Sequence, residues 1–344
     1  RVTRAPAPPT LVMGCSSSKD ENETNHHDIQ TNVAAGGSDG ASGDAVLKTK
    51  TGYRSDVAKD GSHTFTEQLV TNNMHMIDEV YDLTHSTTLG RGACGSVSTC
   101  THKQTGVMYA IKTVSIEAMG AQSMAELRQE IAVQKKLDHP NIVKVFETFE
   151  DAKNHELHII MEMCTGGALV SRMKTHRHGY GERAAATLLE KALSATMYCH
   201  KHGVVHRDIK LDNFIYENED EMAELKLIDF GFASFVAPGK EGMWEQIGTP
   251  SYMAPELWSD HAKEYDSSVD MWALGVVCYM LLSGKRPFHH QDRKEKARMI
   301  CHDELRFPSP DWDRITDAAK DFCRKLMQKN PKDRMPASEA VHHP

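Results

Sequence analysis

Hydrophobic and polar residues follow two different periods along this chain, and the periods predict both strands and helices. Ser96 to Cys100 alternates polar and apolar positions, and Val107 to Lys112 follows a Thr105-Gly106 turn, so both are predicted strands. The stretches from Ser123 to Leu137 and from Ala184 to His202 have helical spacing instead. The pattern therefore predicts a chain that mixes both kinds of element.

Two continuous apolar runs predict buried elements. Leu157 to Cys164 indicates a buried strand that passes into a hinge, where Gly166-Gly167 frees the backbone to begin a second lobe. Met271 to Leu282 is far shorter than the roughly 20 residues needed to cross a bilayer. We expect a buried helix there and no membrane span.

Residues 1 to about 75 show neither period and are rich in Ser, Gly, Asn, Asp and Thr, which predicts a disordered tail before a folded domain at 76–344. Within this tail, positions 13–18 fit the M-G-x-x-x-[ST] pattern for myristoylation at Gly14, with Cys15 placed for palmitoylation. Acylation would require translation to begin at Met13, and two acyl chains would attach the protein firmly to a membrane. The alternative is a solvated tail.

Composition narrows the class of protein. The chain is 40% apolar and 26% charged with a net charge of -8, which is typical of a soluble protein and argues against nucleic-acid binding. Eight cysteines are scattered without a C-x-x-C pair, so we expect free thiols in a reducing compartment such as the cytoplasm. We also expect a monomer.

The chemistry concentrates in the segment from His206 to Asn213 and in Asp229-Phe230-Gly231. Transfer of a phosphoryl group needs one carboxylate beside the acceptor hydroxyl, and a second carboxylate with an amide oxygen to hold Mg²⁺. Asp208, Asp229 and Asn213 can supply that set. The stretch from Gly90 to Val97 reads G-x-G-x-x-G-x-V and can lie close over phosphates. Strands follow these glycines, whereas a helix would follow them in a dinucleotide-binding fold.

From about Asp78 to Pro344, these motifs resemble the signatures of eukaryotic protein kinases in order and spacing. The resemblance implies an α+β bilobal fold, with a small β-rich lobe at 78–163 that carries one main helix and a larger, mainly helical lobe at 165–344. It implies that ATP and Mg²⁺ are bound, that Asp208 is the base, and that Asn213 and Asp229 are the metal ligands.

The resemblance also assigns the nucleotide pocket. Lys112, in Tyr-Ala-Ile-Lys, would contact the α- and β-phosphates, and Glu130 would pair with it, although Glu126 is an open alternative one helical turn earlier. Met161 would be the gatekeeper residue beside adenine. The implied nucleotide contacts are Leu89, Gly90, Gly92, Gly95, Val97, Ala110, Lys112, Met161, Glu162, Cys164 and Ile215.

Other positions resemble Ser/Thr kinases in particular. Lys210 is typical of them, and Thr249 would bridge Asp208 and Lys210. Asp270 to Gly275 matches D-x-W-x-x-G, and Arg334 should pair with Glu256. The family usually continues beyond the position of Pro344, so we expect the domain to be truncated there.

The chain departs from the family in three places. Gln134 stands where an apolar residue usually supports the active position of the main helix, and Ala168 replaces a common glutamate. No Ser, Thr or Tyr lies between Phe235 and Gly248. A carboxylate of Glu241 or Glu245 could replace the usual phosphate, or these residues could simply form a solvated acidic loop.

The segment lengths resemble the calmodulin-dependent group, most of all the calcium-dependent protein kinases of plants and protists. No EF-hand pattern occurs in the sequence, so calcium control does not follow from these residues. We expect transfer of the ATP γ-phosphate to Ser or Thr of protein substrates, with Asp212 favouring basic ones. A pseudokinase scaffold and a small-molecule kinase are the alternatives. The intact Lys and Asp residues argue against a scaffold, and the Gly248-to-Glu256 segment argues against a small-molecule kinase.

Overall fold

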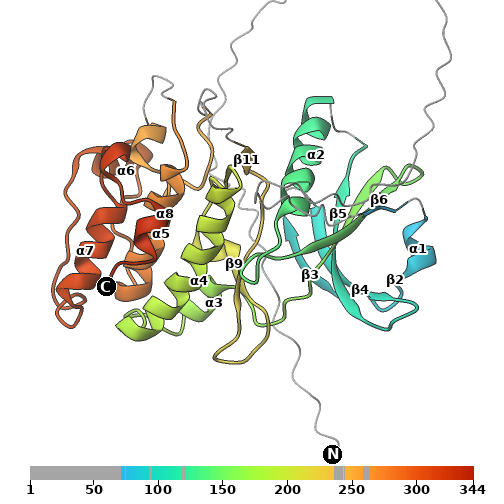
Figure 1. Ribbon diagram of the computed structural model, residues 1–344, viewed down its shortest axis with the longest axis horizontal. Helices are drawn as coiled ribbons and strands as arrows, with labels where there is room; N and C mark the ends of the chain where they lie inside the picture. Colours follow the sequence, from blue (N-terminus) through green and yellow to red (C-terminus); the bar gives the residue numbers. More distant parts are fainter. Residues whose placement is uncertain are drawn as a thin grey trace, which may run out of the picture. The chain divides into compact units, whose positions relative to one another are not determined.

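The computed structural model describes residues 71–344 except 74, 93–94, 118, 120, 236–242, 244 and 259–263. Strands dominate its first part and helices its second (Figure 1). The strands are β1 (Thr71–Asn72), β2 (Tyr81–Asp82), β3 (Thr88–Gly92), β4 (Gly95–His102), β5 (Met108–Ser115), β6 (Val145–Asp151), β7 (Glu156–Met161), β8 (Val204–Val205), β9 (Phe214–Tyr216), β10 (Leu225–Leu227) and β11 (Ser234–Phe235). The helices are α1 (Ile77–Val80), α2 (Ala121–Lys136), α3 (Leu169–Met173), α4 (Glu182–Lys201), α5 (Ser268–Ser283), α6 (Arg293–His302), α7 (Asp317–Leu326) and α8 (Ala337–Ala340), with 3₁₀ turns η1 (Leu211–Asn213), η2 (Pro255–Trp258) and η3 (Pro331–Asp333).

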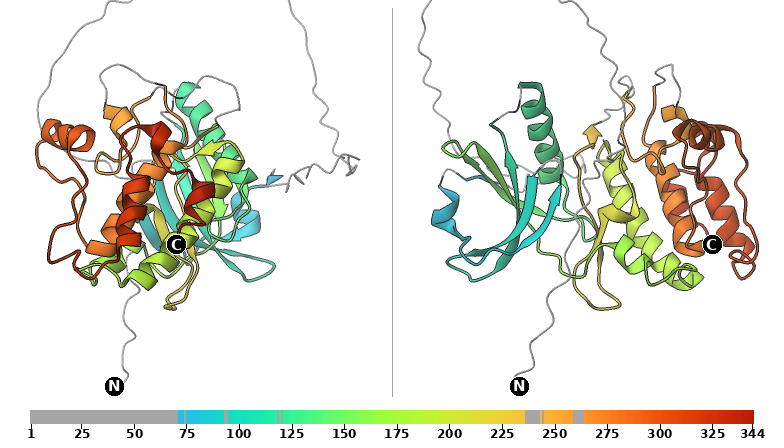
Figure 2. Two further views of the ribbon diagram at one scale, coloured as in Figure 1. Left: turned by 60° about the vertical axis from the view of Figure 1, so that its left-hand side comes forward. Right: turned by 180° about the vertical axis from the view of Figure 1, so that it is seen from behind.

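The N-terminal part is a sheet in the order β1-β6-β7-β5-β4-β2, with β3 also paired to β4. Its pairs are antiparallel except for β1 with β6. Helix α2 lies across this sheet and places Leu127 and Ile131 in a common core with Val97 and Ala110 (Figure 2). The strands predicted from the alternation and the helix predicted from the period are confirmed, with ends shifted by a few residues.

One boundary differs from the sequence expectation. Irregular chain was expected up to about residue 75, but β1 pairs in parallel with β6, with Thr71 opposite Glu147. The side chain of Asn73 extends the attachment because its Nδ2 donates to Glu147 Oε2 at 2.9 Å. Two residues are too short to show a period, so the partner strand decides their conformation. The predicted acylation site at Gly14 and Cys15 lies outside the described residues.

The C-terminal part is built around α5, whose residues are buried on almost every side. A helix that is apolar all round must be covered on all faces, which explains why the run from Met271 to Leu282 has no polar stripe. At Gly275 an added Cβ would lie 2.7 Å from Met327 Cγ and 2.9 Å from Leu326 Cβ. Glycine therefore lets α5 and α7 pack closely.

These features confirm the predicted α+β fold, with a curled sheet and one main helix followed by a mainly helical part. None of the described helices is both long enough and apolar enough to cross a membrane.

Candidate active site

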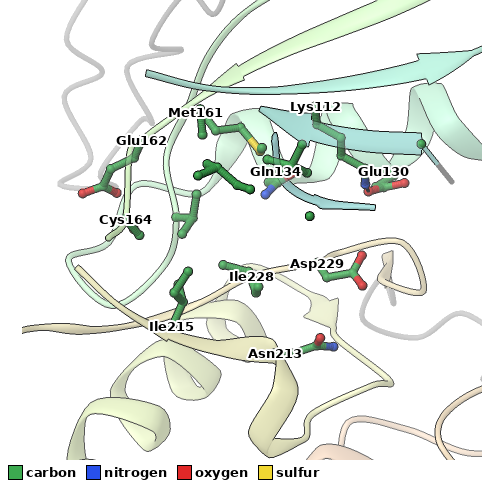
Figure 3. Close-up of a pocket in the computed structure, with 16 residues that line it drawn as sticks. Lys112, Glu130, Gln134, Met161, Glu162, Cys164, Asn213, Ile215, Ile228 and Asp229 are labelled. Atoms are coloured by element: carbon green, nitrogen blue, oxygen red, sulfur yellow. Dashed lines mark hydrogen bonds and ion pairs between the residues drawn. The ribbon is translucent and has the colours of Figure 1, made fainter. Parts of the chain in front are cut away.

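A cavity of about 860 Å³, partly open to solvent, lies between the sheet and the helical part. Lys112, Gln134 and Met161 line one side of it, and Ile215 and Asp229 line the opposite side (Figure 3). Its apolar walls with a few charged groups suit a flat ring that carries an anionic tail. All the predicted nucleotide contacts line the cavity except Gly92, which pairs with Gly95 at the end of β3.

The side chains of Glu162 and Cys164, on the hinge side of the cavity, carry no unpaired charge. Burial raises the pKa of the Cys164 thiol to about 12, so this group stays neutral at physiological pH. The Glu162 carboxylate is paired with Lys226 Nζ at 2.8 Å instead of lying free at the cavity. Neither of these side chains therefore presents an unpaired charge on this side of the cavity.

Lys112 comes from β5 and meets Glu130 from α2, with Nζ 3.2 Å from Oε1. Both side chains are largely buried and both line the cavity. This is the ion pair expected from the sequence. The side chain of Glu126, the alternative partner, lies outside the described residues.

The turn between β3 and β4 brings backbone close to this lysine. Gly95 has a φ of 136°, and a Cβ on it would lie 2.1 Å from the carbonyl oxygen of Thr113. A side chain is therefore excluded here by both conformation and space. The position keeps β4 tight against β5 beside Lys112.

Asp208 is at the centre of a second cluster. One carboxylate oxygen, Oδ2, lies 2.6 Å from Lys210 Nζ. The other, Oδ1, accepts from the hydroxyl of Thr249 at 2.7 Å and from its amide at 3.0 Å. Lys210 also donates to Thr249 Oγ1 at 3.0 Å, so the bridge expected from the sequence is present. The cluster holds the Asp208 carboxylate in a defined position beside the Thr249 hydroxyl.

Asn213 and Asp229 offer side-chain oxygens that could hold a metal ion. Asn213 Nδ2 donates to the Asp208 carbonyl oxygen at 2.9 Å, which turns Oδ1 away from that contact. Asn213 Oδ1 is buried without a hydrogen-bond partner in the described structure, although this residue and Asp229 both line the cavity. A buried unsatisfied oxygen is costly unless something binds it. An oxygen-preferring cation such as Mg²⁺ suits this pair.

The buried carboxylate of Asp270 on α5 organises the loop from His206 to Asn213. Its oxygens accept from the amides of His206 and Arg207 at 2.9 and 2.8 Å and from His200 Nε2 at 2.8 Å. Burial alone would raise the pKa of Asp270, but the hydrogen bond and charge of His200, together with His206, lower it below its ordinary value. Arg207 has a left-handed backbone with φ of 67°, as has Asp229 with φ of 63°. Asp270 therefore fixes a strained backbone at the start of the loop.

Arg207 connects this loop to the segment that follows Asp229. Its Nη1 lies 2.5 Å from Glu245 Oε2 and 3.3 Å from the Tyr265 hydroxyl, and its Nε donates to the Phe232 carbonyl. The Glu245 carboxylate therefore contacts Arg207 directly, as expected if it replaces a phosphate. Glu241 lies outside the described residues.

Gln134 occupies an unusual place on the α2 face of the cavity. It is 6% exposed and lines the space behind Met161, yet its side-chain amide has no hydrogen-bond partner among the described residues. The amide lines a cavity that is partly open to solvent, so it is not among the fully enclosed polar groups that lack a partner in the described structure. The position therefore places a polar group on a largely apolar wall of the cavity.

Replacing Gln134 with leucine should raise the free energy of unfolding by about 1 kcal/mol, since an apolar side chain of similar volume would then fill this largely buried position. Thermal denaturation of the two proteins would show this as a rise in Tm of roughly 2–4 °C. Gln129→Leu is the matched control because Gln129 is exposed on the same helix. An equal rise in both variants, or a fall in Gln134→Leu, would contradict the interpretation.

Two lining residues, Val143 and Ile228, were not identified from the sequence. Ile228 directly precedes Asp229, and that adjacency could have indicated it. Val143 has no comparable local signal. It reaches the cavity because its amide donates to the Leu227 carbonyl at 3.0 Å, a contact between distant segments.

Comparison with known proteins gives a consistent result. The model of the protein kinase domain family matches residues 83–344. Calcium-dependent protein kinase 8 of Arabidopsis thaliana is 39% identical over 78% of this chain and 49% of its own length. A probable myosin light chain kinase of Dictyostelium discoideum is 39% identical over 74% of this chain and 64% of its own length. The chain spans about half the length of the calcium-dependent kinases that it matches.

Proposed function

Since the chain belongs to the protein kinase family, we propose that it transfers the γ-phosphate of ATP to serine or threonine hydroxyls of protein substrates. Use of ATP and Mg²⁺ is general in this family. The observation that carries the proposal is the cluster of Asp208, Lys210 and Thr249, joined by contacts of 2.6–3.0 Å.

Each residue of the site has a separate role in the proposed transfer, according to its position. Asp208 orients the acceptor hydroxyl and accepts its proton, while Lys210 stabilises the negative charge that develops nearby. Lys112, itself fixed by Glu130, neutralises charge on the α- and β-phosphates. When bound, Mg²⁺ neutralises the remaining phosphate charge, and Asn213 and Asp229 would hold it. The catalytic gain comes mainly from positioning and electrostatics.

Phosphoamino-acid analysis after transfer of labelled phosphate to a mixed peptide pool would test this function. Label on serine and threonine alone agrees with the proposal, whereas label on tyrosine contradicts it. Nucleotide binding without any transfer would favour a scaffold.

Activation without loop phosphorylation is part of the proposal. Glu245 replaces the phosphate that Arg207 would otherwise contact, and the carboxylate is 65% exposed, so its contribution is about 1 kcal/mol or less. Glu245→Gln should therefore reduce kcat/KM by roughly threefold to fivefold. Steady-state kinetics would measure the change, with Glu304→Gln, an exposed site before α7, as the control. Full activity in the double variant Glu241→Gln with Glu245→Gln would rule out this role.

A calcium-dependent signalling role and attachment to membranes through an acylated Gly14 and Cys15 are further proposals. The first is supported by the names of the similar kinases, and the second by the sequence pattern alone. Both would require residues outside the described domain.

A further inference from the structure

The phenol of Tyr265 connects Arg207 with the segment that carries Glu245. Arg207 Nη1 lies 3.3 Å from the phenol oxygen, and the phenol hydroxyl donates to the Glu245 carbonyl at 2.9 Å. A guanidinium only donates and a carbonyl only accepts, so a group that lies between them must accept from one and donate to the other. A phenol can do both, whereas the carboxylate of Glu245 can only accept.

This bridge is buried, and its phenol keeps its proton. Tyr265 is 5% exposed, and burial raises the pKa of its hydroxyl, although the hydrogen bond and charge of Arg207 oppose that shift. The hydroxyl is therefore protonated at physiological pH, as donation to the carbonyl requires. The carboxylate of Glu245 is largely exposed instead, so dissolved salt screens its attraction to Arg207. The phenol is thus the contact to Arg207 that depends less on ionic strength.

Two backbone hydrogen bonds fix Tyr265 itself against the same segment. The Met243 amide donates to the Tyr265 carbonyl at 3.1 Å, and the Tyr265 amide donates to the Met243 carbonyl at 3.0 Å. Both side chains are buried. A change of tyrosine to phenylalanine removes the hydroxyl and leaves this backbone pair, so it tests the bridge alone.

Arg207 is held through its backbone as well as its side chain. Its amide donates to Asp270 at 2.8 Å, and its guanidinium contacts Tyr265, which lies shortly before Asp270 in the chain. The left-handed backbone of Arg207 is strained, and such a conformation persists only where its surroundings fix it. Loss of the contact to the guanidinium would therefore loosen the backbone that carries the neighbouring Asp208.

We propose that Tyr265 is a positioning residue for phosphate transfer, an inference that rests on the proposed kinase function. Its phenol bridges Arg207 and the backbone of Glu245, and this bridge keeps Asp208 in place without a phosphate on the segment. The Glu245 carboxylate acts on Arg207 only while the bridge holds its backbone within reach. The effect of the carboxylate therefore depends on the phenol.

Steady-state kinetics of Tyr265→Phe with Mg-ATP and a serine peptide would test the inference. We expect kcat to fall by roughly tenfold, the effect of losing one hydrogen bond in a contact with a charged group. KM for ATP should not change, because neither Tyr265 nor Arg207 is among the described residues that line the nucleotide cavity. Nucleotide binding would be used to count the folded molecules in each preparation.

Tyr279→Phe is the matched control for this change. Tyr279 is also buried, and its hydroxyl donates to the Arg306 carbonyl at 2.8 Å, a contact that involves no residue of the proposed site. The control should lose similar stability and keep its kcat. Equal losses of kcat in the two variants would show that the Tyr265 hydroxyl is merely structural, and would overturn the inference.

Glu245→Gln in two backgrounds tests the dependence of the carboxylate on the phenol. In the unchanged chain it should reduce kcat/KM by roughly threefold to fivefold, but after Tyr265→Phe by less than about twofold, because the carboxylate is then no longer held beside Arg207. An effect of the same size in both backgrounds, including none, would contradict the dependence.

Hydrogen exchange separates this inference from the kinase function itself. The Glu245 carbonyl also accepts from the Ile247 amide at 3.0 Å. Tyr265→Phe should make amide exchange roughly tenfold faster in peptides that contain these two residues, and Tyr279→Phe should not. Unchanged exchange in Tyr265→Phe would overturn the inference. Faster exchange, with no phosphate transfer by the unchanged chain, would contradict the kinase function and leave the bridge standing.

Discussion

Replacing Asp208 with asparagine should lower phosphate transfer by about 10²–10⁴-fold, the range that a general base contributes. Asparagine keeps the shape and can still accept hydrogen bonds through one oxygen, but it cannot take a proton or balance Lys210. Both oxygens of Asp208 have defined partners, so little rearrangement can replace it. Transfer of radiolabelled phosphate to a peptide mixture would measure the loss.

Nucleotide binding separates this catalytic loss from unfolding. Lys210 is 2% exposed and would lose its buried counter-charge, so the variant must be shown to remain folded. Binding of ATP should persist because Asp208 is not among the residues that line the nucleotide cavity. Asp220→Asn makes the same chemical change at an exposed turn and should keep full activity. Transfer in Asp208→Asn close to that of this control would refute the assigned role.

The largest effect on stability is expected at Arg334. Its guanidinium forms a paired contact with Glu256, with nitrogen-to-oxygen distances of 2.7 and 3.0 Å, and also donates to the carbonyls of Ser268 and Gln328. Both charged side chains are almost fully buried. Arg334→Met should therefore reduce the free energy of unfolding by about 3–5 kcal/mol, since the Glu256 carboxylate would be left buried and unpaired.

Denaturant titration of four proteins would measure this coupling: the unchanged chain, Arg334→Met, Glu256→Gln and the double variant. The double variant should be less destabilised than the sum of the single changes, because it removes both charges together. Additive effects, or a loss below about 1 kcal/mol in Arg334→Met, would show that solvent or other groups compensate.

The sequence predicted those parts of the site that depend on order and spacing. Asp208, Asn213 and Asp229 were assigned because few functions need a carboxylate, an amide and a second carboxylate at such intervals. The pairing of Lys112 with Glu130 followed from the strand and helix periods together with the family resemblance. Local pattern and chemistry agreed at these positions, so the prediction required no knowledge of distant contacts.

The remaining features depend on contacts between segments far apart in the chain. Strand β1 exists because β6 offers an edge, and Val143 reaches the cavity through Leu227. Gln134 was recognised as unusual in the sequence, but its place in the cavity wall could be seen only once the helix was packed against the sheet. Contacts of this kind, between segments far apart in the chain, cannot be predicted from the hydrophobic period or from short motifs.

The left-handed backbone of Arg207 and Asp229 has a consequence for the evolution of this protein. Each conformation costs a side-chain-bearing residue about 1–2 kcal/mol, a cost that glycine avoids. Selection for thermal robustness alone would therefore favour glycine at both positions, and a laboratory library screened only for heat resistance should enrich it. Such variants would lose the guanidinium that meets Glu245 and a carboxylate that lines the cavity with Asn213, so the persistence of these two residues would indicate that catalysis is under selection.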